Sequence, residues 1–113
     1  MKAEKTKYTA IVGTEAKLVC IGEEVVDDDD TLLSWVFNGT ELRNTSDRYL
    51  IISDFYTIKQ GSTPKVRTEL SVLNVRYADS GNYSCRIVNL DKEIDEGDTI
   101  TLEVKAEGGK SLN

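Results

Sequence analysis

The 113-residue sequence contains no histidine, a single proline and only two cysteines. The absence of histidine removes the commonest general base, the Ser-His-Asp and Cys-His arrangements, and most zinc sites. No Gly-x-Ser-x-Gly, phosphate-loop or His-Glu-x-x-His motif is present either. No apolar run approaches the roughly 20 residues that a membrane-spanning helix needs. We therefore expect a protein that is not an enzyme and that uses no cofactor.

Length and charge indicate one acidic domain. The hydrophobic fraction of 39% is enough for a core, and the length is near that of a typical single domain. Twenty acidic residues against 14 basic ones give a net charge of −6. Because such a chain repels phosphate backbones, we expect no nucleic-acid partner. Residues 1–5 lack the apolar stretch of a signal peptide, and we expect the chain to be cut from a larger protein.

The two cysteines, Cys20 and Cys85, are 65 positions apart. Two thiols cannot supply a four-ligand zinc site, and no Cys-x-x-Cys redox pair exists. The simplest interpretation is one long-range disulfide, which contributes about 4 kcal/mol in the chain-entropy model. Structural disulfides persist in oxidising compartments, so the pair indicates a location outside the cytosol. The alternative is two buried free thiols in a cytosolic domain.

The residues around these cysteines carry a family resemblance. Residues 79–85 have the pattern D-x-G-x-Y-x-C, and Trp35 lies 15 positions after Cys20. Together they resemble the immunoglobulin superfamily over nearly the whole chain. The resemblance implies an all-β, two-sheet antiparallel Greek-key sandwich, with a disulfide from Cys20 on strand B to Cys85 on strand F. It also implies that Trp35 packs on that disulfide and that Tyr83 forms the tyrosine corner.

Apolar-rich and alternating runs predict strands independently, and no helical period is sustained. The predicted strands are 16–21, 31–37, 40–42, 48–52, 69–75 and 98–104, and residues 86–89 continue the strand that holds Tyr83 and Cys85. Between two of them, Asn38-Gly39 predicts a tight hairpin. We expect an N-terminal extension over 1–7, the domain over 8–105 and a linker or tail over 106–113. Residues 55–60 are compatible either with a longer strand or with a protruding hairpin.

The family resemblance also implies an ion pair and a subclass. An arginine at the position of Arg48 commonly pairs with the aspartate of D-x-G, here Asp79, and we expect a bidentate pair. The string from Trp35 to Leu42 is typical of intermediate-type (I-set) domains. The 65-residue cysteine spacing is instead in the range of variable-type domains.

Three Asn-x-Ser/Thr sequons begin at Asn38, Asn44 and Asn82. The predicted fold puts all three at the surface, because strand alternation turns Asn82 outward when Tyr83 and Cys85 face inward. We predict N-glycosylation, which agrees with the oxidising compartment that the cysteines indicate. The alternative is coincidence in a polar surface.

Acidic side chains gather in two segments, which hold more than half of the acidic residues. Residues 23–30 contain six carboxylates, and residues 91–98 contain five. The resemblance places both segments at one end of the sandwich. The candidate partner-binding residues there are Asp27, Asp28, Asp29, Asp30, Asp91, Glu93, Asp95, Glu96 and Asp98. Three interpretations remain open: a docking surface for a basic partner, a Ca²⁺ site, and a solvated loop that keeps the domain soluble.

Two further surfaces are candidates for binding. The sheet that contains strands C and F turns Val36 and Val88 outward, which predicts a modest exposed valine pair. Tyr56 follows Phe55, and one of these adjacent aromatic residues should face solvent. Tyr56 either anchors a partner or covers the sheet edge.

These features predict an extracellular or cell-surface recognition module in adhesion or receptor signalling, within a membrane-attached or secreted parent protein. The expected partner is another protein, either an immunoglobulin domain (homophilic or heterophilic) or a basic secreted factor. One alternative is a ligand-binding or spacer domain of a growth-factor or guidance receptor. The other is a spacer in an intracellular array, which would leave both cysteines reduced and the sequons bare.

Overall fold

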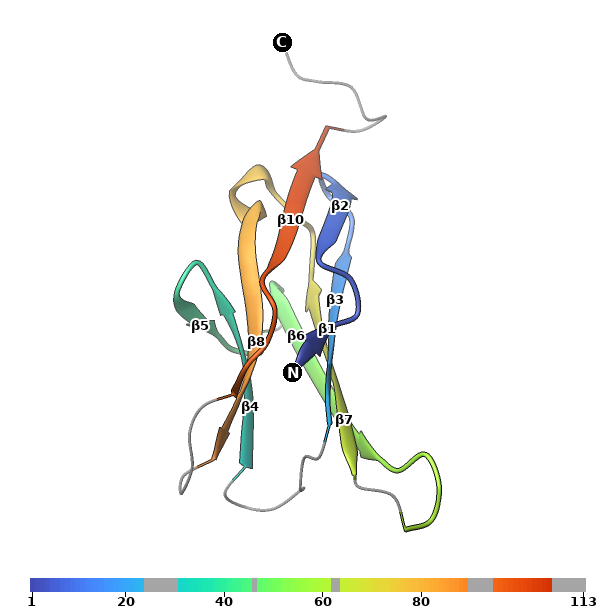
Figure 1. The fold of residues 1–113 in the computed structure, drawn as a ribbon. Helices are drawn as coiled ribbons and strands as arrows, with labels where there is room; N and C mark the ends of the chain where they lie inside the picture. Colours follow the sequence, from blue (N-terminus) through green and yellow to red (C-terminus); the bar gives the residue numbers. More distant parts are fainter. Residues whose placement is uncertain (24–30, 46, 62–63, 90–94, 107–113) are drawn as a thin grey trace.

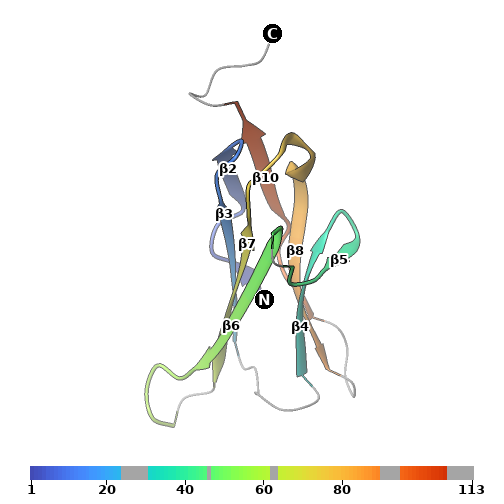
Figure 2. The same cartoon turned by 180° about the vertical axis from the view of Figure 1, so that it is seen from behind.

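The strands form two sheets packed face to face (Figures 1 and 2). The computed structural model describes residues 1–23, 31–45, 47–61, 64–89 and 95–106. The first sheet has the order β1 (Lys2–Ala3), β3 (Ala16–Gly22), β7 (Lys65–Val72), β6 (Tyr49–Tyr56). The second has the order β2 (Lys7–Ile11), β10 (Ile100–Lys105), β8 (Gly81–Asn89), β4 (Thr31–Phe37), β5 (Thr40–Leu42), and β9 (Asp95–Glu96) also pairs with β8. The predicted two-sheet class is confirmed.

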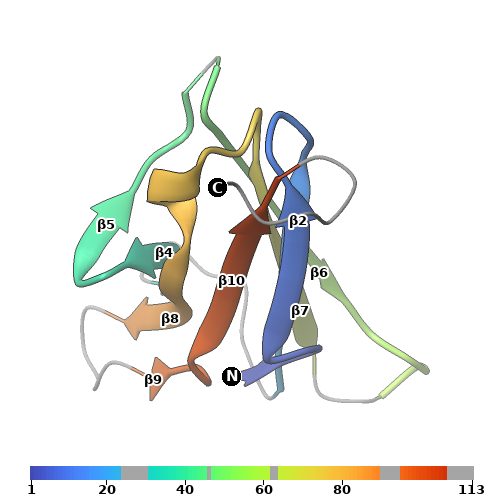
Figure 3. The same ribbon diagram turned by 90° about the horizontal axis from the view of Figure 1, so that it is seen from above.

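The N-terminal residues belong to the sandwich. In β1, Lys2 pairs with Ile21 and Ala3 with Cys20, and Met1 and Ala3 pack against the core. The chain then crosses to the second sheet, where β2 runs parallel to β10 (Figure 3). All other strand pairs are antiparallel. Backbone pairing thus connects both ends of the expected N-terminal extension, residues 1–7, to the sheets, although this segment has no apolar run.

The strand pair β6–β7 is longer than the sequence pattern indicates. Phe55 and Tyr56 extend β6, and Tyr56 pairs with Lys65 at the start of β7. The strand and hairpin alternatives for residues 55–60 therefore both apply in part, since the strand ends at Tyr56 and a connection follows. The predicted strand over 69–75 begins four residues earlier and ends at Val72. Asn74 adopts a φ of 51°, a left-handed conformation that is incompatible with strand continuation.

The turn between β4 and β5 follows the sequence prediction. Asn38 and Gly39 have φ angles of 47° and 87°, and Phe37 pairs with Thr40 across the turn. Positive φ at both central residues is the geometry of a type I′ hairpin. The Asn-Gly prediction is confirmed.

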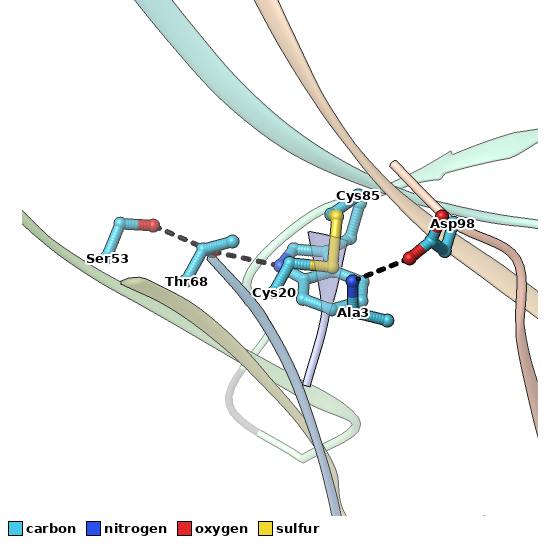
Figure 4. The surroundings of a disulfide bond; sticks show 7 residues. Ala3, Cys20, Ser53, Thr68, Cys85 and Asp98 are labelled. Carbon is cyan, nitrogen blue, oxygen red and sulfur yellow. Dashed lines mark hydrogen bonds between the residues drawn. A yellow bond between two sulfur atoms is a disulfide. The ribbon is translucent and has the colours of Figure 1, made fainter. Parts of the chain in front are cut away.

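The Cys20–Cys85 disulfide joins β3 of the first sheet to β8 of the second, with 6.5 Å between the two Cα atoms. Both cysteines and Trp35 are completely buried. The Trp35 indole Nε1 donates a hydrogen bond to Thr68 Oγ1 (3.0 Å), and Ser53 Oγ donates to the same oxygen (2.9 Å; Figure 4). The single polar atom of the tryptophan is thus satisfied by the opposite sheet.

Tyr83 closes the core at the start of β8. Its hydroxyl donates to the Asp79 carbonyl (2.7 Å), which is the tyrosine-corner bond that the family resemblance implies. Its ring stacks on Phe37, with the ring centroids 4.4 Å apart. Burial, reinforced by the nearby Asp79 carboxylate, raises the pKa of Tyr83 well above its usual range. The hydroxyl therefore stays a neutral donor.

A β-bulge interrupts the pairing of the last strand. Arg86 pairs with Glu96, but Tyr83 pairs with Ile100, so one extra residue lies between them on the later segment. Gly97 lies in this bulge, where a Cβ atom would come within 2.4 Å of the Cys85 sulfur. The disulfide therefore leaves no space for a side chain at Gly97.

We expect Trp35→Ala to lower the free energy of unfolding by about 3–5 kcal/mol, because it opens a cavity between the sheets. Thr68→Val should cost less, since it removes only the hydroxyl that accepts the indole hydrogen bond. Urea unfolding of both variants measures these values. A loss below about 1 kcal/mol for Trp35→Ala would mean that Trp35 does not organise the core.

Candidate binding surfaces

Arg48 and Asp79 fasten one end of the sandwich. Arg48 Nη2 lies 2.5 Å from Asp79 Oδ1, while Asp79 Oδ2 accepts a hydrogen bond from the Arg76 backbone N–H (2.8 Å). Arg48 Nη1 donates to the carbonyls of Leu73 (2.8 Å) and Asn74 (3.1 Å). The hydrogen bond to Asp79 is the main reason why the pKa of Arg48 is raised.

This geometry differs from the bidentate pair that we expected. Only one carboxylate oxygen of Asp79 contacts Arg48, because the other oxygen satisfies the backbone ahead of the 3-10 turn η1 (Tyr77–Asp79). The second guanidinium nitrogen is used by the chain that leaves β7. The pair therefore ties three segments together and has a structural role.

The outer face of the second sheet differs from the predicted valine pair. Val36 is only 5% exposed, and its cross-strand neighbours are Glu41 and Ser84. Val88 lies opposite Leu32, which is 53% exposed. Alternation gives the direction of Val36 correctly, but it does not show how far the neighbouring strands cover it. The exposed apolar residue of this face is Leu32, which strand alternation from Trp35 also turns outward.

Arg86 lies at the centre of the same outer face. It pairs with Ser34 on β4 and with Glu96 on β9, and its Nη2 lies 3.5 Å from Glu96 Oε1. Its Nε is buried and has no hydrogen-bond partner among the described residues. The half-buried guanidinium of Arg86 thus separates Leu32 and Val88 from Val36. The outer face holds the apolar pair Leu32–Val88 next to the charged pair Arg86–Glu96.

Three acidic residues of the two clusters have described contacts. Glu23 Oε1 lies 3.3 Å from Lys65 Nζ, Glu96 contacts Arg86, and Asp98 Oδ2 accepts a hydrogen bond from the Ala3 backbone (3.2 Å; Figure 4). Asp95 begins β9. The candidates outside the described residues are Asp27, Asp28, Asp29, Asp30, Asp91 and Glu93.

The strands nevertheless bring the flanks of both acidic segments together. Thr31 at the start of β4 pairs with Asn89 at the end of β8, and Gly22 ends β3 at the same end of the sandwich. Within the described ranges, no group of three carboxylate, histidine or cysteine side chains is arranged to hold a metal ion. The calcium alternative concerns residues beyond those ranges.

The three sequon asparagines are exposed and lie away from that end. Asn38 and Asn82 are neighbours: the Asn38 N–H donates to the Asn82 carbonyl (3.0 Å), and the Asn82 N–H donates to Asn38 Oδ1 (3.2 Å). Asn44 Oδ1 accepts a hydrogen bond from the Ile51 backbone N–H (2.6 Å). Thr101 Oγ1 donates to Asn82 Oδ1 (3.1 Å). Each side chain thus bonds to the domain through its oxygen.

The third surface is the outer side of β6. Tyr56 is 37% exposed and Phe55 is half-buried, so the two aromatic residues face opposite sides as expected. Leu50 and Ile52 are also exposed, by 43% and 46%. Both were missed by the sequence reasoning, although their alternation with Tyr49 and Ile51 in an edge strand was the available signal.

A comparison with protein-family models matches the immunoglobulin domain over residues 6–95, which is most of the chain. The chain belongs to the immunoglobulin domain family. A comparison with curated proteins gives no match. Domains of this family are in general non-enzymatic protein-interaction modules, and a disulfide within such a domain suggests an extracellular location. In the described part of the chain, no helix has the length and hydropathy needed to cross a membrane.

We expect Arg48→Met to lower the free energy of unfolding by about 3 kcal/mol, because it leaves the Asp79 carboxylate buried without its cation. The matched control is Arg67→Met, which removes a more exposed arginine 3.6 Å from Glu69 and should cost less than about 1 kcal/mol. Thermal and urea unfolding report both values. Equal losses in the two variants would show that the Arg48–Asp79 pair is no more than a surface contact.

Proposed function

We propose that this domain is an extracellular recognition module that binds another protein through the acidic end of its second sheet. In this proposal it serves cell adhesion or cell-surface receptor signalling within a larger, membrane-attached or secreted protein. Such binding requires no catalysed reaction, and the sheet supplies a rigid surface for the partner.

The distribution of the sequons is the observation that carries this proposal. Asn38 and Asn82 lie at the far end of β4 and β8 from Thr31 and Asn89. The seven residues of β4 separate the two ends by roughly 20 Å. Glycans on these asparagines would leave the end with Leu32, Arg86 and the acidic segments open to a partner.

Charge supports a basic partner surface. Acidic residues concentrated at one end of the domain accelerate encounter with a positively charged protein, and salt weakens this effect. The adjacent apolar pair of Leu32 and Val88 supplies a small area that a partner could desolvate. An immunoglobulin domain with a basic face and a basic secreted factor both have this chemistry.

We further propose that the domain is of the intermediate (I-set) type. In the described part of the chain, the second sheet ends at β5, the C′ strand, whereas variable domains add a C″ strand. The split of the N-terminal strand into β1 and β2 extends both sheets.

The proposal is tested by presenting the glycosylated domain as a multimer to a panel of ectodomains and secreted proteins that includes the domain itself. A partner that binds with an affinity that falls as salt rises supports the proposal. Binding that does not depend on salt and maps to the first sheet would contradict the proposed surface. If the partner is a soluble factor, the domain is the ligand-binding domain of a growth-factor or guidance receptor.

Changing Asp27–Asp30 together to glutamine, which removes the four charges without creating a sequon ahead of Thr31, should slow association with that partner about tenfold at low salt, with little effect at high salt. The melting temperature should stay within a few degrees or rise, because repulsion is relieved. The matched control removes the same number of charges at Glu15, Glu41, Asp47 and Glu103, which are exposed elsewhere. If the control slows association equally, net charge rather than the acidic end directs binding.

A further inference from the structure

The outer edge of the first sheet carries an apolar ridge. β6 is the terminal strand of this sheet, and its outer face carries Leu50, Ile52, Asp54 and Tyr56 in alternation, so that one carboxylate lies among three large apolar side chains. We call Leu50, Ile52 and Tyr56 the edge ridge. An edge strand that is both apolar and unpaired is a template for association with another chain, and natural proteins cover or charge such edges.

The backbone of this edge is covered over half of its length. The Thr45 N–H donates to the Tyr49 carbonyl (2.9 Å), and Thr45 Oγ1 accepts from the Tyr49 N–H (3.0 Å). Asn44 Oδ1 accepts from the Ile51 N–H. In an antiparallel strand, alternate residues direct their backbone groups to the same side. The backbone groups of Ser53 and Phe55 therefore face the same edge, beyond the reach of the segment that covers Tyr49 and Ile51.

The chemistry of the Ile51 contact fixes the orientation of the Asn44 side chain. A backbone N–H can only donate, so the atom that faces it must be the carboxamide oxygen. The Asn44 nitrogen Nδ2 therefore points elsewhere, and it makes no hydrogen bond to any described residue. Nδ2 is the atom to which an N-linked glycan is attached, and the attachment leaves the oxygen free to keep its bond to Ile51.

We propose that an N-linked glycan on Asn44 covers the free edge of β6 and its edge ridge, and so prevents edge-to-edge association of this domain. The inference rests on the proposed secretory location. In forming the linkage, Nδ2 loses one proton and bonds to the anomeric carbon of a lipid-diphosphate-linked oligosaccharide, and the lipid diphosphate leaves.

Three observations make the glycan the occupant of the edge ridge. Its attachment nitrogen belongs to the carboxamide group whose oxygen accepts the hydrogen bond from the Ile51 N–H. Ile51 lies between Leu50 and Ile52 in the strand. The glycan is covalently held there, bulky and strongly hydrated. The segment that presents it already caps this edge. The glycans proposed at Asn38 and Asn82 lie at the β4–β5 turn and the start of β8 in the other sheet.

Two variants remove this glycan and keep the oxygen that bonds Ile51. Ser46→Ala destroys the sequon and leaves Asn44 unchanged, and Asn44→Asp replaces the amide with a carboxylate. The matched control is Thr40→Ala, which destroys the sequon of Asn38. Each protein is secreted from eukaryotic cells, its glycan occupancy is mapped by mass spectrometry, and its self-association is measured by sedimentation velocity.

We expect Asn44 to be occupied, and the wild type and Thr40→Ala to stay monomeric. Ser46→Ala and Asn44→Asp should self-associate at concentrations at least tenfold lower than the wild type. Adding Ile52→Lys to Ser46→Ala should restore the monomer, because a lysine blocks an edge strand. The double variant Ser46→Ala, Ile52→Lys lacks the glycan and should be monomeric. Faster amide hydrogen exchange at Ser53 and Phe55 in this variant than in the glycosylated wild type would locate the effect at β6.

The possible failures are distinguishable. Occupancy at Asn38 and Asn82 without Asn44 would overturn the edge-cover inference and leave the secretory location intact. Glycan-free Asn44 variants that are as monomeric as the wild type would overturn it as well, as would association that Ile52→Lys does not reverse. A secreted protein without any glycan would overturn both the inference and its premise.

Discussion

The Cys20–Cys85 disulfide and the indole of Trp35 form the centre on which both sheets depend. The disulfide ties β3 to β8, and the indole hydrogen bond to Thr68 ties β4 to β7. The chain-entropy model gives the disulfide about 4 kcal/mol, which is a large share of the stability of a small domain. The close approach of Gly97 to Cys85 shows how tightly the last strand is fitted around this centre.

The two ends of the sandwich are specialised by what the strands place there. At one end, Arg48, Asp79 and Tyr83 use nearly every polar atom to connect the chain to itself. At the other end, the described acidic residues include the exposed Glu23 and Glu96, which belong to the two acidic segments, residues 23–30 and 91–98. The end with the Arg48–Asp79 pair and the sequons of Asn38, Asn44 and Asn82 therefore differs in charge and hydrogen bonding from the acidic end, and the proposed binding mode depends on this difference.

Much of this fold was predictable because a few residue types have only one role here. The only two cysteines, the only tryptophan and the pattern around Tyr83 fixed the strand assignments, and alternation gave the faces. The pairing of Lys2 and Ala3 was not predictable, since a two-residue strand has no period. The burial of Val36 and the contact between Asn38 and Asn82 depend on neighbours from other strands, which sequence spacing does not report. The Arg48–Asp79 partnership was predictable by resemblance, whereas its use of separate oxygens depends on the backbone of η1.

The most direct test of this account is the redox state of Cys20 and Cys85 in protein isolated from its natural source. The protein would be alkylated without reductant, and its mass determined before and after removal of glycans. The account predicts that both cysteines resist alkylation until they are reduced, and that at least one sequon carries a glycan. Alkylation of both cysteines without reduction, together with bare sequons, would contradict it and identify an intracellular spacer domain instead.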